Sequence, residues 1–380
     1  GSNVMQNEYV TWTQDDPHSR AYQTLSSDAS RAIAARLGIG PATSAKICLD
    51  CHADNVPLNR RGEKFQLSDG VGCEACHGGA EDWLSTHYNA PAVDHAANLA
   101  AGLYATENVA ERAELCLSCH LGTDSKFATH RIMAAGHPRL SFELDTFTEL
   151  WRTAGRQPHY RIDADYSQRK NTYSHIYTWS SGVLAEARKR MALIRSGNFA
   201  GDRMFPELGL YDCHACHRSM KSVQWRRLPR HGNAEPGLPF LNDGALVMSL
   251  ALARATDTAI ARELENALIR LHVAGSDDVA TIQAAAGTLD GILRRLQSRL
   301  TPAAMRDRER TLLRELLATG AEGNYLDYAS AEQAFMAVQM LVFEIGDQRL
   351  EAALDPLGDA LQDDERYRPA RFATLLAELE

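Results

Sequence analysis

The sequence has no unpaired cysteine, no long hydrophobic run and no excess of positive charge. Its eight cysteines all fall into Cys-x-x-Cys pairs, which leaves none for a role outside that pattern. No apolar run approaches the roughly 20 residues needed to cross a bilayer, so we do not expect the chain to span a membrane. A net charge of −9 makes nucleic acid and anionic membranes poor partners, and it favours a partner protein with a basic docking face.

A histidine follows each cysteine pair directly, in CLDCH at 48–52, CEACH at 73–77, CLSCH at 116–120 and CHACH at 213–217. Histidine makes up 14 of the 380 residues, so four such followers by chance have odds on the order of one in several hundred thousand. The spacing fits haem c, because two sulfurs must reach the porphyrin vinyl groups while the next imidazole lies under the iron. We therefore predict four covalently bound haem c groups. The attachment residues would be Cys48, Cys51, Cys73, Cys76, Cys116, Cys119, Cys213 and Cys216, and the proximal iron ligands His52, His77, His120 and His217.

Three other roles of Cys-x-x-Cys pairs fit this chain less well. A tetrathiolate zinc site has no use for a histidine after every pair. A thioredoxin-like dithiol usually occurs once, at the start of a helix that follows a strand. A disulfide across this spacing is strained and would stabilise so large a chain little. Haem attachment is the role that uses every residue of the repeated pattern.

The pattern of the chain changes near residue 240. Before that point lie all four motifs and little sustained periodicity, whereas Ala, Leu, Arg and Glu recur at helical spacing from Gly244 onward. The stretch between, RRLPRHGNAEPGLPFLND, has three prolines and no apolar period. We predict four parts: a tail at 1–9, a tetrahaem cytochrome domain at 10–225, a linker at 226–243 and a helical bundle at 244–380.

The predicted fold class is mainly α. It combines a multihaem cytochrome domain, with little regular structure besides helices, and a C-terminal helical bundle. In the haem region, residues 181–197 place apolar side chains on one side of a helix. In the bundle the clearest helix runs over 301–320, where Thr301 can cap, Pro302 suits the first turn and Gly320 suits the position after the last. Similar segments run over 258–274, 277–300, 329–345, 348–362 and 368–379.

Ten histidines remain after the four proximal ones. A second imidazole makes a haem low-spin and coordinatively full, whereas an open face allows a substrate to bind. His18 precedes all the motifs, and His87 follows the second motif in a loop of small and polar residues. His130 and His137 lie seven residues apart, near a glycine and a proline that turn the chain. We predict that His18, His87, His130 and His137 are distal iron ligands.

Other histidines have different expected roles. His214 lies between the two cysteines of CHACH and is unable to reach its own iron, so we expect it near a haem propionate, with ligation of an adjacent haem as the alternative. His175 lies among aromatic residues, which fits a hydrogen-bonded histidine, a distal ligand or a proton donor. His231 is typical of a loop residue. His272 is typical of a hydrogen-bonded histidine within a helix.

Several of these motifs together resemble the tetrahaem cytochrome c-554 family over roughly residues 10–220. They are CLDCH, GCEACHGG with the trailing His87, ELCLSCH and YDCHACH, preceded by the early His18. The resemblance implies a mainly helical fold with haems in close stacked pairs, mostly with two histidine ligands. It also implies electron transfer in respiration or nitrogen-compound oxidation, and one haem with five ligands. The helical region after 240 has no match in that family's core.

Two functions fit these residues. The first is an electron carrier, because four motifs within about 170 residues would bring their irons close together and spare histidines could fill every distal site. The alternative is a multihaem oxidoreductase in which one open-site haem acts on a small nitrogen or sulfur compound. In that case His175, Tyr173 and Tyr177 could supply protons.

Location and partners follow from the cofactor. Haem is attached to thiols outside the bacterial cytoplasm, so we expect a periplasmic protein whose export signal is missing from this sequence. The opening Gly1 and Ser2 are typical of a cloning remnant. We expect redox partner proteins. The stripe of leucines after residue 300 fits packing within the bundle as well as a contact between two copies of the chain, so self-association through the bundle is a second expectation.

Overall fold

The described residues fold into helices joined by loops. The structure is a computed structural model that describes residues 8–88, 95–153, 162–201, 206–217 and 227–379. Within these ranges no strand or sheet occurs beyond two isolated bridges. The predicted mainly α fold class is confirmed. No helix in this part of the chain is both long enough and apolar enough to cross a membrane.

The chain divides into two compact units. Unit 1 comprises Gly1–Leu140 and Glu149–Thr172, and unit 2 comprises Ser141–Thr148 and Tyr173–Glu380. The first three cysteine motifs lie in unit 1, whereas CHACH lies in unit 2 with the bundle helices. This division differs from the predicted one, which groups all four motifs and separates them from the bundle.

Unit 1 consists of short helices and loops. Its helices are α1 Glu8–Gln14, η1 Pro17–Arg20, α2 Ala21–Thr24, α3 Asp28–Leu37, α4 Lys46–His52, η2 Leu58–Arg60, η3 Leu67–Asp69, α5 Cys73–His77, α6 Leu84–Tyr88, α7 His95–Ala100, α8 Val109–His120, α9 His130–Ala134 and α11 Ala164–Arg169, while α10 Leu144–Thr153 contains residues of both units. Asn108 caps α8 by accepting hydrogen bonds from its first N–H groups. Apolar contacts form small clusters, one around Leu25 and Leu49 and another around Leu37 and Ile132.

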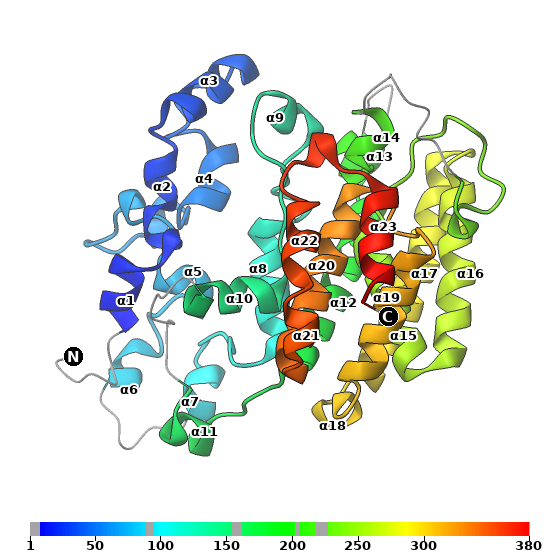
Figure 1. The fold of residues 1–380 in the computed structure, drawn as a ribbon. Helices are drawn as coiled ribbons and strands as arrows, with labels where there is room; N and C mark the ends of the chain where they lie inside the picture. Colours follow the sequence, from blue (N-terminus) through cyan, green and yellow to red (C-terminus); the bar gives the residue numbers. More distant parts are fainter. Residues whose placement is uncertain (1–7, 89–94, 154–161, 202–205, 218–226, 380) are drawn as a thin grey trace. The chain divides into compact units, whose positions relative to one another are not determined.

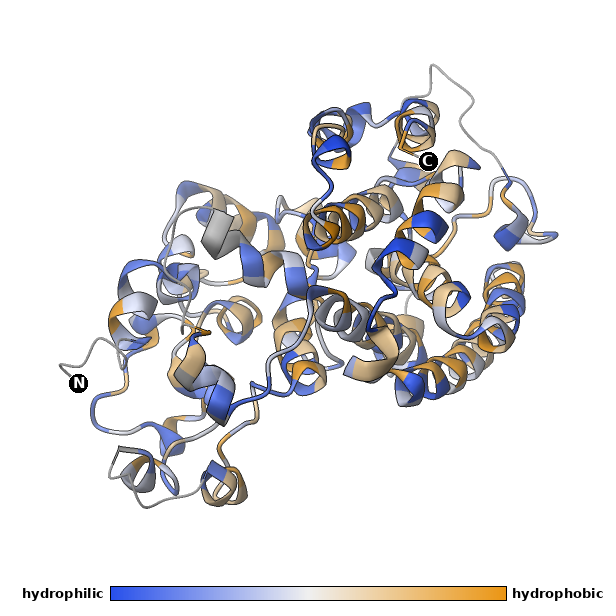
Figure 2. Ribbon diagram, turned by 60° about the horizontal axis from the view of Figure 1, so that its bottom comes forward, coloured by the Kyte–Doolittle hydropathy of each residue, from blue (hydrophilic) through white to orange (hydrophobic). Residues whose placement is uncertain are grey.

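Unit 2 is a bundle of longer helices (Figure 1). Its helices are α12 His175–Arg195, α13 Gly197–Ala200, η4 Leu208–Leu210, α14 Cys213–Cys216, η5 Pro229–His231, α15 Gly244–Thr256, α16 Thr258–Ala274, α17 Val279–Arg299, α18 Pro302–Met305, α19 Glu309–Ala321, α20 Tyr328–Ile345, α21 Gln348–Glu351, α22 Leu354–Asp359, η6 Asp364–Arg366 and α23 Pro369–Ala377. Figure 2 shows that the long helices carry hydrophobic and hydrophilic residues on different sides, and the buried apolar residues form the core between them.

Helix α12 is the buried centre of unit 2. Ser174 begins it by accepting a hydrogen bond from the N–H of Tyr177, so the helix starts at His175 rather than at residue 181 as predicted. Its buried residues lie on every side, from Ile176 to Ile194, as expected of a helix surrounded by others. It packs against α15, α17 and α20.

The helix predicted from Thr301 to Gly320 is two helices. Thr301 caps α18 as predicted, but α18 ends at Met305, and Asp307 then adopts a left-handed φ of 59° that breaks the helix. Gly320 lies inside α19 rather than after it. A Cβ atom at Gly320 would lie 2.1 Å from Cδ1 of Leu376, so this glycine permits the close packing of α19 and α23.

The segment predicted as a linker packs into unit 2. Within its described part, Leu228, Arg230, His231 and Leu241 are buried. The short helix η5 lies against α16. The prolines do prevent a long helix here, but the segment belongs to the core of the unit rather than forming an exposed connection.

Candidate functional site

Each cysteine motif forms or ends a short helix. CLDCH ends α4, CEACH forms α5, CLSCH ends α8, and the first four residues of CHACH form α14. Residues i, i+3 and i+4 share one face of a helix, so the two thiols and the imidazole project to the same side in the first three motifs, whereas His217 of the fourth follows the end of α14. All eight cysteines are free thiols. This arrangement fits the attachment of haem at each motif.

The histidine of the first motif, His52, faces His137. Their ring centroids lie 6.3 Å apart and their planes cross at 80°. Nδ1 of His137 lies 2.8 Å from the carbonyl oxygen of Pro138, and Nδ1 of His52 lies 3.2 Å from that of Ala21. A carbonyl oxygen only accepts, so both rings carry a proton on Nδ1 and keep a lone pair on Nε2. Burial lowers the pKa of His52 and so favours its neutral form.

Two arginines fix the position of His137 by joining α3 to α9. Arg36 donates to a carbonyl oxygen at the end of α9 at 2.8 Å, and Arg131 donates to the carbonyl oxygen of Leu37 at 2.8 Å. Gly136, with a φ of 111°, then turns the chain just before His137. The ring is therefore positioned by contacts that lie far from it in sequence.

The histidine of the third motif, His120, faces His18. Their ring centroids lie 6.0 Å apart and their planes cross at 90°. Nδ1 of His18 donates to Oδ1 of the buried Asp16 at 2.9 Å, and this hydrogen bond raises the pKa of His18. The carbonyl oxygen of His18 accepts from the N–H of Val71 at 3.0 Å. Gly70 allows this approach, because a Cβ atom there would lie 2.5 Å from that oxygen.

The spacing of both pairs fits an iron atom between the rings. A histidine nitrogen lies about 2.0 Å from a first-row metal, and the ring centre lies about 1.1 Å behind that nitrogen, so two imidazoles on one iron have centroids about 6.2 Å apart. The observed separations are 6.3 Å and 6.0 Å. The two ring pairs therefore match, in the separation of their centroids, two imidazoles bound to one iron.

The first and third motifs lie side by side. Cys51 and Cys119 are in hydrogen-bond contact, and Nζ of Lys126 lies 2.9 Å from Sγ of Cys119. The same ammonium donates to the carbonyl oxygen of Asp50 at 3.2 Å. The hydrogen bond from Cys51 and the charge of Lys126 lower the pKa of Cys119 well below its ordinary value, while the same contact raises that of Cys51. Before haem attachment, Cys119 is thus the more acidic thiol of the two.

The second motif has its own backbone support. The carbonyl oxygen of His77 accepts from the N–H of Tyr104 at 2.9 Å. His87 lies in α6 and packs edge-on against Trp83, with ring centroids 5.5 Å apart. His130 begins α9. The assignment of His87 and His130 as distal ligands stays a prediction.

The fourth motif is held by a short antiparallel pairing with the segment before α15. The N–H of Asp212 donates to the carbonyl oxygen of Phe240 at 2.9 Å, and the N–H of Asn242 donates to that of Leu210 at 3.0 Å. Asp212 also caps α14 by accepting from the N–H of His214 at 3.0 Å. The segment predicted as a linker therefore positions CHACH.

The ring of His214 packs beside Tyr328, with centroids 6.0 Å apart, and 23% of its side chain is exposed. The expected position near a propionate stays a prediction, and residues 218–226 after this motif lie outside the described residues. Burial, together with the carboxylates of Asp327 and Asp243, raises the pKa of the neighbouring Asp212 to about 8. The surroundings of this motif are therefore rich in buried carboxylates.

His175 begins α12 and pairs with a buried carboxylate. Its Nδ1 lies 3.1 Å and 3.2 Å from the two oxygens of Asp145. Tyr173 and Tyr177 stack nearby with ring centroids 5.1 Å apart. Burial and the charge of Asp145 raise the pKa of the neighbouring Glu143 to about 7. The sequence indicated the aromatic surroundings of His175 but not Asp145, whose contact depends on tertiary structure.

Comparison with known families adds to this geometry. The family model for cytochrome c554 and c-prime matches residues 5–78, a segment that contains His18 and the first two motifs. The match confirms the resemblance to the cytochrome c554 family over this segment. Comparison with the curated proteins and with the solved structures finds no match. Residues 5–78 are therefore similar to the family of cytochrome c554 and c-prime.

Proposed function

We propose that the chain is a tetrahaem cytochrome that carries electrons between partner proteins, with two histidine ligands at most of its haems. The observation that carries the proposal is the crossed pairing of His52 with His137 and of His120 with His18. Two imidazole ligands leave no open position on an iron, which favours electron transfer over substrate binding. Bound haem c supplies an iron that accepts and releases one electron.

The groups around the four rings support this role. For three of these rings, Asp16 and two backbone carbonyls accept the Nδ1 proton, so the Nε2 lone pairs of His18, His137 and His52 are available without a change of tautomer. A ligand held in this way moves little when the charge of the iron changes. The Asp16 carboxylate also makes His18 a more basic ligand, which stabilises the oxidised iron.

Two further features support transfer within unit 1 and between proteins. Contact between Cys51 and Cys119 would bring the haems of the first and third motifs close together. The net charge of −9 supports docking to partners through a basic face on the partner. The chemistry of haem attachment supports export to the periplasm. Self-association through the bundle is a further part of the proposal that rests on sequence alone.

One observation favours the alternative, an oxidoreductase with one open-site haem. His175 is hydrogen-bonded to the carboxylate of Asp145, and this pair could supply protons to a substrate. The stacked rings of Tyr173 and Tyr177 lie nearby. The pair lies in unit 2, so this reaction would require a haem with an open site near α12.

Optical and electron paramagnetic resonance spectra of the purified holoprotein separate the two functions. An electron carrier should show low-spin ferric haem throughout, including highly anisotropic signals from crossed imidazole planes, and its reduced form should bind neither carbon monoxide nor nitric oxide. A high-spin fraction near one haem in four, together with ligand binding on reduction, would favour the oxidoreductase instead.

A further inference from the structure

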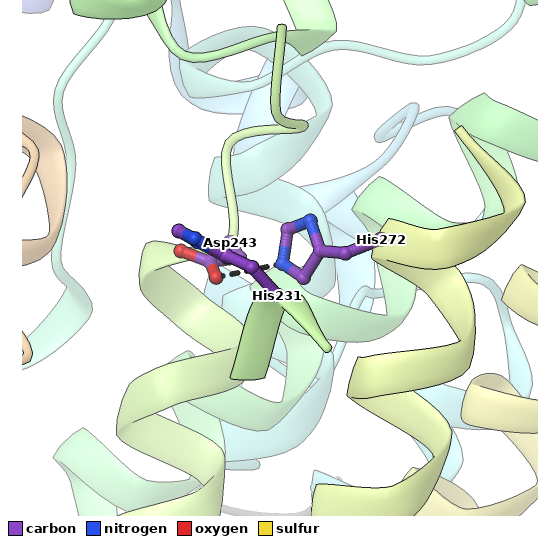
Figure 3. A group of neighbouring side chains, drawn as sticks. All are labelled: His231, Asp243 and His272. Carbon is purple, nitrogen blue, oxygen red and sulfur yellow. Dashed lines mark hydrogen bonds and ion pairs between the residues drawn. The ribbon is translucent and has the colours of Figure 1, made fainter. Parts of the chain in front are cut away.

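The buried polar cluster of unit 2 lies beside the fourth motif and outside every cysteine motif. Figure 3 shows its three central side chains: His231 from η5, Asp243 just before α15, and His272 from α16. All three are at most 3% exposed. The sequence predicted that His231 lies in a loop and that His272 is a hydrogen-bonded residue of a helix, but it did not predict that the two lie close together. The cluster therefore joins three segments of unit 2 at one point.

Asp243 is the acceptor at the centre of this cluster. Its Oδ2 accepts from Nε of Arg230 at 2.6 Å and from Nε2 of His272 at 2.9 Å, and its Oδ1 lies 3.4 Å from a second nitrogen of Arg230. Burial alone would raise the pKa of Asp243, but Arg230 and His272 hold it well below its usual range. Asp243 is therefore a carboxylate that accepts from a buried guanidinium and from a buried imidazole.

The donor set argues against a metal ion at this point. Ligand atoms of His231, Asp243 and His272 do lie within 4.8 Å of one another. However, the guanidinium of Arg230 already occupies the carboxylate and would repel a cation. Nδ1 of His231 accepts from the N–H of Leu228 at 3.2 Å, so the neutral ring holds its proton on Nε2 rather than offering a lone pair there. Hydrogen bonds and an ion pair therefore account for the contacts of Asp243, while Nδ1 of His272 is buried without a hydrogen-bond partner among the described residues.

Two routes connect this cluster to CHACH. In the first, Asn242 precedes Asp243 directly, and its pairing with Leu210 continues into the pairing of Asp212 with Phe240. Asp212 then caps α14.

The second route begins at Arg230, which donates to the carbonyl oxygen of Asn324 at 2.6 Å and lies 3.6 Å from Asp327. Asp327 caps α20, and the next residue, Tyr328, packs against His214 of the motif.

We infer that Asp243 is a positioning residue for the fourth haem site, acting through Arg230 and the segment that pairs with residues 210–212. The inference rests on the proposed function, in which CHACH binds a haem. It gives the helical bundle a role beyond packing, because α15, α16 and α20 all meet the network that presents this motif. A change at Asp243 would alter the orientation of α14 and of His217, and with it the potential of one haem.

The test compares Asp243→Asn with Asp290→Asn in the full-length holoprotein. Asp290 is the matched control, since it is a buried carboxylate of unit 2 that pairs with Arg188 at 3.2 Å and Arg294 at 3.0 Å, and none of its ion pairs among the described residues involves α14. The midpoint potentials and ferric spectra of all four haems are measured. A variant with Cys213→Ser and Cys216→Ser identifies which signals belong to the fourth motif.

We expect Asp243→Asn to shift one midpoint potential, that of the fourth motif, and Asp290→Asn to shift none. If Asp243→Asn lowers the unfolding temperature but leaves all four potentials and spectra unchanged, Asp243 is only a structural residue and the inference is wrong. One equivalent of non-haem metal in the wild type would also overturn it. If the variant does not accumulate, His272→Leu removes one donor and His272→Gln keeps a donor, and only the first should shift the same potential.

The result also separates this inference from the proposed function. If the wild type carries fewer than four haems, or if the double cysteine variant loses none, the proposed function fails at CHACH itself. If four haems are present and Asp243→Asn shifts none of their potentials, the proposed function stands and the positioning role fails.

Discussion

The ring centroids of His52 and His137 lie 6.3 Å apart, and the ring planes cross at 80°. His52 ends α4, whereas His137 lies in the loop after α9. This separation is the distance that two imidazoles keep on one iron. The same relationship holds between His120 and His18 at 6.0 Å. The two pairs support the proposal that His137 and His18 are distal ligands at the first and third motifs.

Replacing His137 by alanine should convert one haem from low-spin to high-spin, because the iron at the first motif would lose its sixth ligand. Electron paramagnetic resonance of the ferric protein measures this change. About one low-spin signal in four should be lost, because the four CxxCH motifs predict four haems. His95→Ala is the matched control, since His95 pairs with Glu107 instead of a motif histidine. An unchanged spectrum in His137→Ala would remove His137 from the ligand set.

Replacing Asp16 by asparagine should raise the potential of the haem at the third motif. The carboxylate accepts from Nδ1 of His18 at 2.9 Å, and its loss makes the ligand less basic and removes a negative charge, so the oxidised iron is less stabilised. We expect a rise on the order of tens of millivolts by redox titration. Asp28→Asn, which changes an exposed carboxylate in α3, should leave the potentials unchanged. A fall in potential would contradict the role of Asp16.

These predictions depend on features that the sequence reveals to different degrees. The motifs and the helices depend on residues that lie close together in the sequence. Helix α16 spans Thr258–Ala274 as predicted, because its apolar spacing and its capping residue Asp257 both lie within this stretch of sequence. The break at Asp307 was missed, since the leucine stripe beyond it keeps a helical period. The predicted segment 348–362 likewise divides, into α21 and α22.

Contacts between residues that lie far apart in the chain were not predictable from the sequence. It indicated His18 and His137 as distal candidates but not which motif each would face, because that depends on how the helices of unit 1 pack. The segment 226–243 has the composition of a linker, yet its buried Arg230 and His231 require partners that only the folded bundle supplies.

Glu143 should make the stability of unit 2 depend on pH. Its pKa is raised to about 7 in the folded chain from an ordinary value of 4.5, so the folded state binds this proton more tightly than the unfolded state. The contribution to stability is therefore full below about pH 4.5 and is lost as pH rises through about 7.

Urea unfolding at pH 5 and pH 8 measures this effect. The free energy of unfolding should fall between the two by about 3 kcal/mol more in the wild type than in Glu143→Gln. The exposed Glu235→Gln serves as the control and should behave as the wild type. An equal pH dependence in all three proteins would show that Glu143 is not the group responsible.

Gly320→Ala should destabilise the bundle, whereas Gly291→Ala should not. A Cβ atom at Gly320 would lie 2.1 Å from Leu376 and 2.8 Å from the ring of Tyr325, while one at Gly291 would meet nothing within 4 Å. Overpacking costs about 1–3 kcal/mol, and alanine at an open helical site gains up to about 1 kcal/mol over glycine. Thermal unfolding of the two variants compares these costs. Equal effects would mean that α19 and α23 can move apart at little cost.

The intact mass of the exported protein tests the central claim, a tetrahaem cytochrome, most directly. We predict that the mass exceeds that of the polypeptide by four haem groups, and that the variant with Cys213→Ser and Cys216→Ser carries three. A wild-type mass with any other number of haems would contradict the account.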